Sequence, residues 1–136
     1  MALTAADSFS TYFKNLSATN EICVALGTTL SEGTTLFTDY EPTTVASCII
    51  VTSYGGGKPD KDGYKRLTSV SIMIKGKSRQ MIKKTAQSVI NVLHENGNVL
   101  TGLVIADTSE PLPVEVYEGA EYIKYSTNFT VKYIKL

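Results

Sequence analysis

The residue types that catalyse reactions or bind metals are sparse and scattered in this chain of 136 residues. It has one histidine, His94, and two cysteines, Cys23 and Cys48, which lie in apolar stretches. Metal sites and nucleophilic triads need such groups at short, defined spacings or beside a nucleophile elbow, and the residues around His94 show neither pattern. We therefore expect two buried thiols, a histidine whose positive charge favours a helix C-terminus, and no catalytic residue, metal site or cofactor.

A glycine-rich stretch is the second feature whose residue types can carry chemistry. It consists of Gly55, Gly56, Gly57, Lys58, Pro59, Asp60 and Lys61. A phosphate-binding loop needs a glycine-lysine pair that leads directly into a helix, whereas Lys58 precedes a proline and the residues beyond it favour a strand. We interpret the stretch as an exposed loop that either acts as a spacer or becomes ordered on a partner.

A run of positive charges is the third feature. It leads from a predicted strand end into a predicted helix and contains Lys75, Lys77, Arg79, Lys83 and Lys84. Such a patch is either a solvated face or a docking surface for an acidic neighbour. Thirteen basic residues balance thirteen acidic ones, and no aromatic residues alternate with this patch, so nucleic-acid recognition is not expected. The later acids, Glu110, Glu115, Glu118 and Glu121, are interpreted as a solvated face.

Size and composition predict a single globular domain across residues 1–136. The apolar fraction is 43% and the charged fraction is 19%, values that are typical of a chain with an ordinary hydrophobic core. No apolar run is long enough to cross a membrane, and the N-terminus lacks the basic and apolar regions of a signal peptide. We therefore expect synthesis in the cytoplasm and no membrane partner.

Hydrophobic periodicity predicts the helices and strands. Helical spacing occurs at residues 9–16 and again in a short piece up to Gly27, which either continues the first helix with a bend or stands alone. It returns between Met81 and Leu93, before a predicted stop at Asn96-Gly97. Strands are expected at 36–40, 45–54, 64–75, 100–106, 114–117 and 123–133, with strict alternation in the last.

The order of these elements predicts an α+β fold. We expect an antiparallel or mixed sheet with an N-terminal helix and one long helix packed on one face. Pro42 should end the first strand because proline cannot donate to a ladder, and the apolar strand at 45–54 should be buried on both faces. In the last strand, the alternation places Phe129 on the inward face.

A series of short motifs goes further than composition. A strand with Pro42 is followed by an apolar strand ending in Tyr54-Gly55-Gly56, then a strand that passes through Gly76-Lys77-Ser78-Arg79 into an amphipathic helix. That helix ends at His94-Glu95-Asn96-Gly97, and a proline turn at 111–113 precedes a long strand containing Asn128-Phe129-Thr130-Val131. Across roughly Phe9 to Tyr133, this arrangement resembles the small minor capsid and tail terminator proteins of long-tailed bacteriophages.

The resemblance implies a structural role and no enzymatic activity. Such proteins form a hexameric ring that caps the tail tube, stops its polymerisation and joins it to the neck. The expected partners are further copies of the chain, the tail tube protein and a neck or connector protein, in a virion assembled in the host cytoplasm. Family members often carry an arginine just before the last strand, which residues 118–121 lack, so no contact of that arginine is carried over.

Two other functions stay open at this point. One is a head-side connector or another neck adaptor subunit, which would bind the portal side of the neck instead of the tube. The other is a small-ligand-binding α+β domain, which would need a deep pocket lined by titratable groups with perturbed pKa values.

Overall fold

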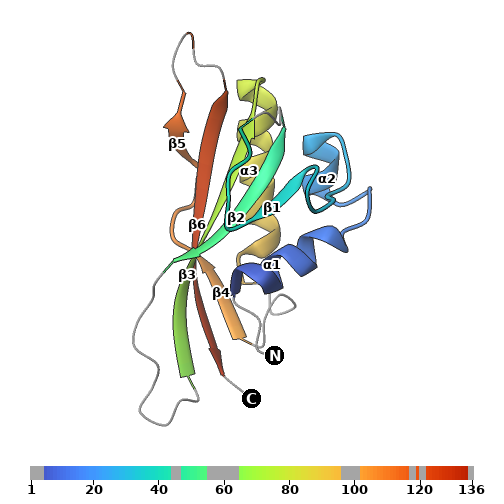
Figure 1. Cartoon of the computed structure of the whole chain (residues 1–136). Coiled ribbons are helices and arrows are strands. Elements are labelled where there is room, and N and C mark those ends of the chain that lie inside the picture. The colour runs from blue at the N-terminus through green and yellow to red at the C-terminus, as the bar shows by residue number, and fades with distance from the viewer. Residues whose placement is uncertain are drawn as a thin grey trace.

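The computed structural model describes residues 5–43, 47–54, 65–95, 102–116, 119 and 122–134. Within these residues the fold is α+β, as predicted, with a mixed sheet of six strands and three helices (Figure 1). The helices are α1 (Ala5–Lys14), α2 (Glu21–Leu26) and α3 (Arg79–Leu93). The strands are β1 (Leu36–Thr38), β2 (Cys48–Tyr54), β3 (Lys65–Gly76), β4 (Gly102–Ala106), β5 (Leu112–Glu115) and β6 (Ile123–Ile134).

The two longest strands, β3 and β6, form the centre of the sheet. The strand order is β1-β2-β3-β6-β4, and β5 also pairs with β6. Only the β1–β2 pair is parallel among the described strands, and the other pairs are antiparallel. Because β3 occupies one edge of β6 along its whole length, β4 and β5 share the other edge, opposite different segments of β6.

Alternation along β3 and β6 separates a helix-covered face from a helix-free face. Val70, Ile72 and Ile74 of β3 are buried with Phe129 and Val131 of β6, in one core that also contains residues of all three helices. Figure 1 shows these helices together along one side of the sheet. The same face includes Thr127, whose buried hydroxyl donates a hydrogen bond to the Ile72 carbonyl 2.9 Å away. The inward polar residue of the alternating strand is thus satisfied within the core.

The strand β2 is buried on both faces where its apolar residues lie, as predicted. Ile49 and Val51 belong to the helix-covered core, whereas Cys48 and Ile50 pack with Phe37 in a second, smaller cluster on the helix-free face. The next two residues of β2, Thr52 and Ser53, are only partly buried.

The helix boundaries follow local capping chemistry. α1 and α2 are separate helices, and α2 begins at the N-cap Asn20, whose side chain accepts a hydrogen bond from the Ile22 amide. Gly27 ends α2 with a φ of 86°, the left-handed conformation predicted for it. In α3, Ser78 is the N-cap and its hydroxyl accepts a hydrogen bond from the Met81 amide.

Three predicted boundaries differ from the structure or fall outside it. β1 ends at Thr38 and not at Pro42, because Asp39 has a φ of 66° and turns the chain out of the extended conformation. β5 begins at Leu112 and includes Pro113, two residues earlier than expected, because pairing with the long β6 extends it. The predicted helix stop at Asn96-Gly97 lies outside the described residues.

We predict that Phe129→Ala lowers the free energy of unfolding by about 3–5 kcal/mol, the usual cost of removing a buried aromatic side chain. Phe129 is fully buried, and its ring centroid lies 6.3 Å from that of Phe9 in α1. Val114→Ala, at an exposed position of β5, is the control and should change stability by less than about 0.5 kcal/mol. Denaturant unfolding measures both, and a loss well under 1 kcal/mol for Phe129→Ala would contradict the assignment of the two sheet faces.

Candidate functional site

Of the two predicted interaction features, the glycine-rich loop and the basic patch, the structure describes only the second. The glycine-rich loop, Gly55 to Lys61, lies outside the described residues. The basic patch is described, and its members Lys77, Arg79, Lys83 and Lys84 are exposed beside or along the N-terminal half of α3. Arg79, Lys83 and Lys84 also line an open hollow together with Gln80 and Gln87. We use the name basic patch below for Lys77, Arg79, Lys83 and Lys84.

Lys75 is not part of this exposed surface, which corrects the prediction. Its side chain is only 2% exposed, because it extends over the helix-free face beneath the residues that follow β1. The Lys75 amino group donates a hydrogen bond to the Pro42 carbonyl and lies 3.6 Å from a Glu41 carboxylate oxygen. It also lies 4.4 Å from the centroid of the Tyr122 ring, within the range of a cation–π interaction.

Register explains how these groups meet. Cys48 of β2, Lys75 of β3 and Lys124 of β6 are neighbours across three adjacent strands, and Glu115 of β5 pairs with Lys124. Two lysines thus lie side by side, an arrangement that is repulsive unless anions separate them. Glu41 supplies one such anion, with a carboxylate oxygen 2.7 Å from the Lys124 amino group, and a Glu115 oxygen lies 3.9 Å from the same group. We call Glu41, Lys75, Glu115 and Lys124 the charge cluster.

Two pKa values in this region depart from their usual range. Burial acts to raise the pKa of Glu41, but the hydrogen bond from Lys124 and the charges of Lys124 and Lys75 outweigh it, so the pKa is lowered from 4.5. Burial raises the pKa of the Cys48 thiol to about 11, although the charge of Lys75 acts in the opposite direction. Cys48 is therefore a neutral thiol at neutral pH, and both cysteines are buried and free, as predicted.

Within the charge cluster, Lys75 is enclosed, whereas the Glu41 and Glu115 side chains are partly exposed. Nucleophilic catalysis by a lysine needs an amine that a substrate can reach, and the Lys75 amine is buried with its hydrogen atoms directed at protein partners. Within the described residues, no three His, Cys, Asp or Glu side chains gather closely enough to hold a metal ion. Sequence reasoning missed Glu41 because its partner Lys124 lies 83 positions further along the chain.

His94 has a structural role at the edge of the sheet. Its Nδ1 atom accepts a hydrogen bond from the Ala106 amide at 3.1 Å, and its Nε2 atom lies 3.5 Å from a Glu95 oxygen. The Glu95 amide donates to the Val104 carbonyl at 2.7 Å, so the end of α3 caps the outer edge of β4.

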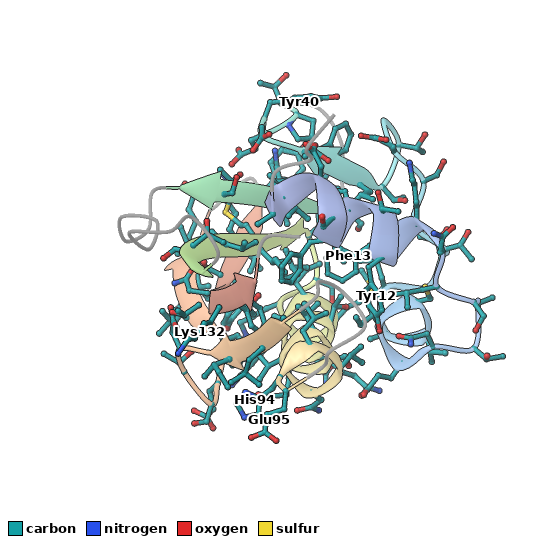
Figure 2. The ribbon with its side chains drawn as sticks, turned by 90° about the horizontal axis from the view of Figure 1, so that it is seen from below. Tyr12, Phe13, Tyr40, His94, Glu95 and Lys132 are labelled. Atoms are coloured by element: carbon teal, nitrogen blue, oxygen red, sulfur yellow. The ribbon has the colours of Figure 1, made fainter. Side chains whose placement is uncertain are left out.

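A second hollow lies beside His94. It is lined by Ile90, Asn91, His94, Ala106, Asp107, Thr108 and Ser109, and it lies between the C-terminal half of α3 and the residues that follow β4. Figure 2 shows His94 and Glu95 together at one margin of the molecule, with Tyr40 at the opposite margin. This placement agrees with the strand order, in which β4 and β1 lie at opposite ends.

The helix-free face of the sheet carries small polar side chains where the second apolar cluster ends. The hydroxyls of Ser71 and Ser126 lie 3.3 Å apart, and Ser126 donates to the Asn128 side chain at 3.1 Å. No helix or strand among the described elements lies over these residues, which are partly buried. In the described part of the chain, this region of the helix-free face carries small, uncharged polar side chains.

Comparison with known proteins gives no family for this chain, since no family model matches it and no curated protein is significantly similar to it. None of the described helices combines the length and the apolar character that crossing a bilayer requires.

We predict that Lys75→Met lowers the free energy of unfolding by about 1–3 kcal/mol, because it leaves the partly buried Pro42 carbonyl without its donor while keeping the apolar stem. Lys77→Met is the matched control, since Lys77 also lies near the Tyr122 ring, at 5.8 Å, but is exposed. It should stay within about 0.5 kcal/mol of the wild type. Equal stabilities of both variants in denaturant unfolding would contradict the role assigned to the Lys75 amine.

The lowered pKa of Glu41 predicts a stability that depends on pH. Its contribution is fully present above the unfolded-state pKa near 4.5 and is lost as the pH falls through the lower folded-state value, because the protonated carboxyl no longer pairs with Lys124. The free energy of unfolding of the wild type should therefore fall more steeply than that of Glu41→Gln between about pH 5 and pH 3. Parallel slopes in urea unfolding across this range would contradict it.

Proposed function

We propose that this protein is a structural subunit of the virion of a long-tailed bacteriophage, acting as a tail terminator. In this proposal, copies of the chain form a hexameric ring on the tail tube, stop tube polymerisation and join the tube to the neck. The work is done by docking of surfaces, and no residue of the chain breaks or forms a covalent bond.

The order and pairing of the elements support the proposal. Two of the motifs that carry the resemblance have defined places in the described fold. Gly76-Lys77-Ser78-Arg79 is the turn that caps α3, and Asn128-Phe129-Thr130-Val131 lies in the centre of β6. A fold by itself does not establish a function, so the molecule must also present a surface that suits the role.

The observation that carries the proposal is the helix-free face of the sheet. All three helices lie on the other face, so the chain presents two large surfaces of different chemistry in opposite directions, one of strands and one of helices. A closed ring is built from heterologous contacts, in which one patch of each subunit meets a different patch of the next. A subunit that must also contact a tube and a neck needs further separate surfaces, and the basic patch on α3 is a candidate for an acidic neighbour.

The proposal predicts that the purified protein limits the length of tail tubes. Tube protein polymerised in the presence of the chain should give shorter tubes with extra density at one end, as seen by negative-stain electron microscopy. Deleting Lys58 to Lys61 should abolish this effect and leave the circular dichroism spectrum unchanged, if the glycine-rich loop contacts the tube or the neck.

Three outcomes separate the alternatives. Tubes of unchanged length that never carry the protein would contradict the proposal. Binding to an isolated portal-side adaptor in place of the tube would indicate a head-side connector instead. Full activity of the deletion variant would reduce the loop to a spacer and leave the role of the chain intact.

A further inference from the structure

The residues that follow β1 turn back across the helix-free face of the sheet. The Asp39 amide still donates to the Val51 carbonyl at 2.8 Å, at the end of the paired part of β1. Pro42, only a few residues later, already accepts the hydrogen bond from Lys75, which pairs with Cys48. The chain therefore passes from the level of Val51 back to the level of Cys48, over the outward side of β2.

We call residues 39–43 the strap, and it lies over the second, smaller apolar cluster. The ring centroid of Tyr40 in the strap is 5.3 Å from that of Phe37 in the cluster, with the rings edge to face. Cys48 belongs to the same cluster and is fully buried, and the charges of three members of the charge cluster act on the pKa of its thiol. The thiol thus lies close to the groups that hold the strap.

The contacts that hold the strap on the sheet are mostly polar. Its Glu41 carboxylate lies 2.7 Å from the Lys124 amine and 3.6 Å from the Lys75 amine, which also donates to the Pro42 carbonyl. Parallel neighbours such as β1 and β2 are usually joined by a helix, whereas the strap forms neither helix nor strand, and its residues other than Pro42 are exposed. A segment with so little buried apolar surface opens at a lower free energy than the whole fold.

Asp39 forms a hinge at the β1 end of the strap. Its φ of 66° lies in the left-handed region, which aspartate enters more readily than most residues but which still costs free energy. Release of the strap would let Asp39 return to an extended conformation. The closed position therefore depends on the contacts that Glu41 and Pro42 make further along the strap.

Glu41 is the ionised group on which these contacts depend. The titratable or charged groups around it, and around the lysines that it contacts, are Lys75 of β3, Lys124 of β6, Glu115 of β5, Cys48 of β2, Tyr122 and Lys77. Burial acts to raise the pKa of Glu41, but the hydrogen bond from Lys124 and the two lysine charges outweigh it, so the pKa is lowered. The closed strap thus favours the carboxylate, and protonation of Glu41 favours the open strap.

We propose that the strap opens about Asp39 as a separate unit, and that the negative charge of Glu41 keeps it closed over Cys48. Loss of that charge releases the strap while the helix-covered core stays folded. The open strap uncovers the second apolar cluster, which consists of Phe37, Cys48 and Ile50 with Met73 packed against it. This device belongs to the single chain and does not rest on the tail-terminator proposal.

Thiol labelling of the native protein tests the opening, because the two cysteines lie in different places. Cys23 is also buried, but in the helix-covered core, so opening of the strap leaves it covered. Dithiodipyridine reacts with thiols at neutral and at acidic pH, and mass spectrometry of the digested protein assigns each label. The measured quantity is the rate of labelling at Cys48 divided by the rate at Cys23.

The charge of Glu41 should control this ratio of rates. Glu41→Gln should raise the ratio at pH 7 at least about threefold, because a partly exposed ion pair contributes up to about 1 kcal/mol. In the wild type, lowering the pH from 7 to about 4 should raise the ratio as Glu41 becomes protonated, whereas the ratio of Glu41→Gln should not respond.

Glu115→Gln is the matched control. It removes a carboxylate of similar exposure that also lies near Lys124, at 3.9 Å, but on β5 and not on the strap. Its ratio of rates should stay within about twofold of the wild type at both pH values. Circular dichroism confirms that both variants are folded under the labelling conditions.

Three results would overturn the inference. The first is a ratio of rates that is the same in the wild type and in Glu41→Gln. The second is an equal rise in Glu41→Gln and Glu115→Gln, which would indicate a general effect of charge. The third is labelling of Cys48 only at the rate of global unfolding, as measured in urea. Tube-length limitation is measured separately, so none of these results bears on the tail-terminator proposal.

Discussion

The antiparallel register of β3 and β6 is the constraint on which the rest of the structure depends. Their twelve paired positions decide which side chains face the helices and which face away, and a shift by one residue would exchange the two faces. The same register places Lys75 beside Lys124, and their repulsion requires anions nearby. Glu41 and Glu115, which lie outside β3 and β6, supply these anions. The pairing of β3 with β6 thus determines where the charge cluster forms.

Patterns in the sequence predicted most of the elements because burial on one face leaves a periodic trace. The period-two alternation of β6 and the helical spacing of α3 both mark residues that lie in the main core. Lys75 was predicted as a member of an exposed basic patch, which is wrong because its side chain is buried. The burial of Lys75 depends on the turn at Asp39, which brings Glu41 and Pro42 over the sheet. No pattern in the sequence near Lys75 predicts this contact.

Among the surface features, some were predictable from the sequence and others were not. The exposure of Lys77, Arg79 and Lys83 follows from their place in or next to an amphipathic helix, and sequence alone was sufficient to predict it. The role of His94 was not predictable, because its partner Ala106 lies in a strand that the sequence does not align with the end of α3. Contacts between segments that are far apart in the sequence therefore cannot be predicted from hydrophobic periodicity.

The central proposal is that this chain acts by docking and assembly as part of a phage tail. Cross-linking mass spectrometry of purified virions tests it most directly, because zero-length reagents join lysines to carboxylates that are in contact. The account predicts that peptides of this chain are present in virions and are linked to other copies of the chain and to the tube protein. Virions that lack the chain, or that contain it linked only to head proteins, would contradict it.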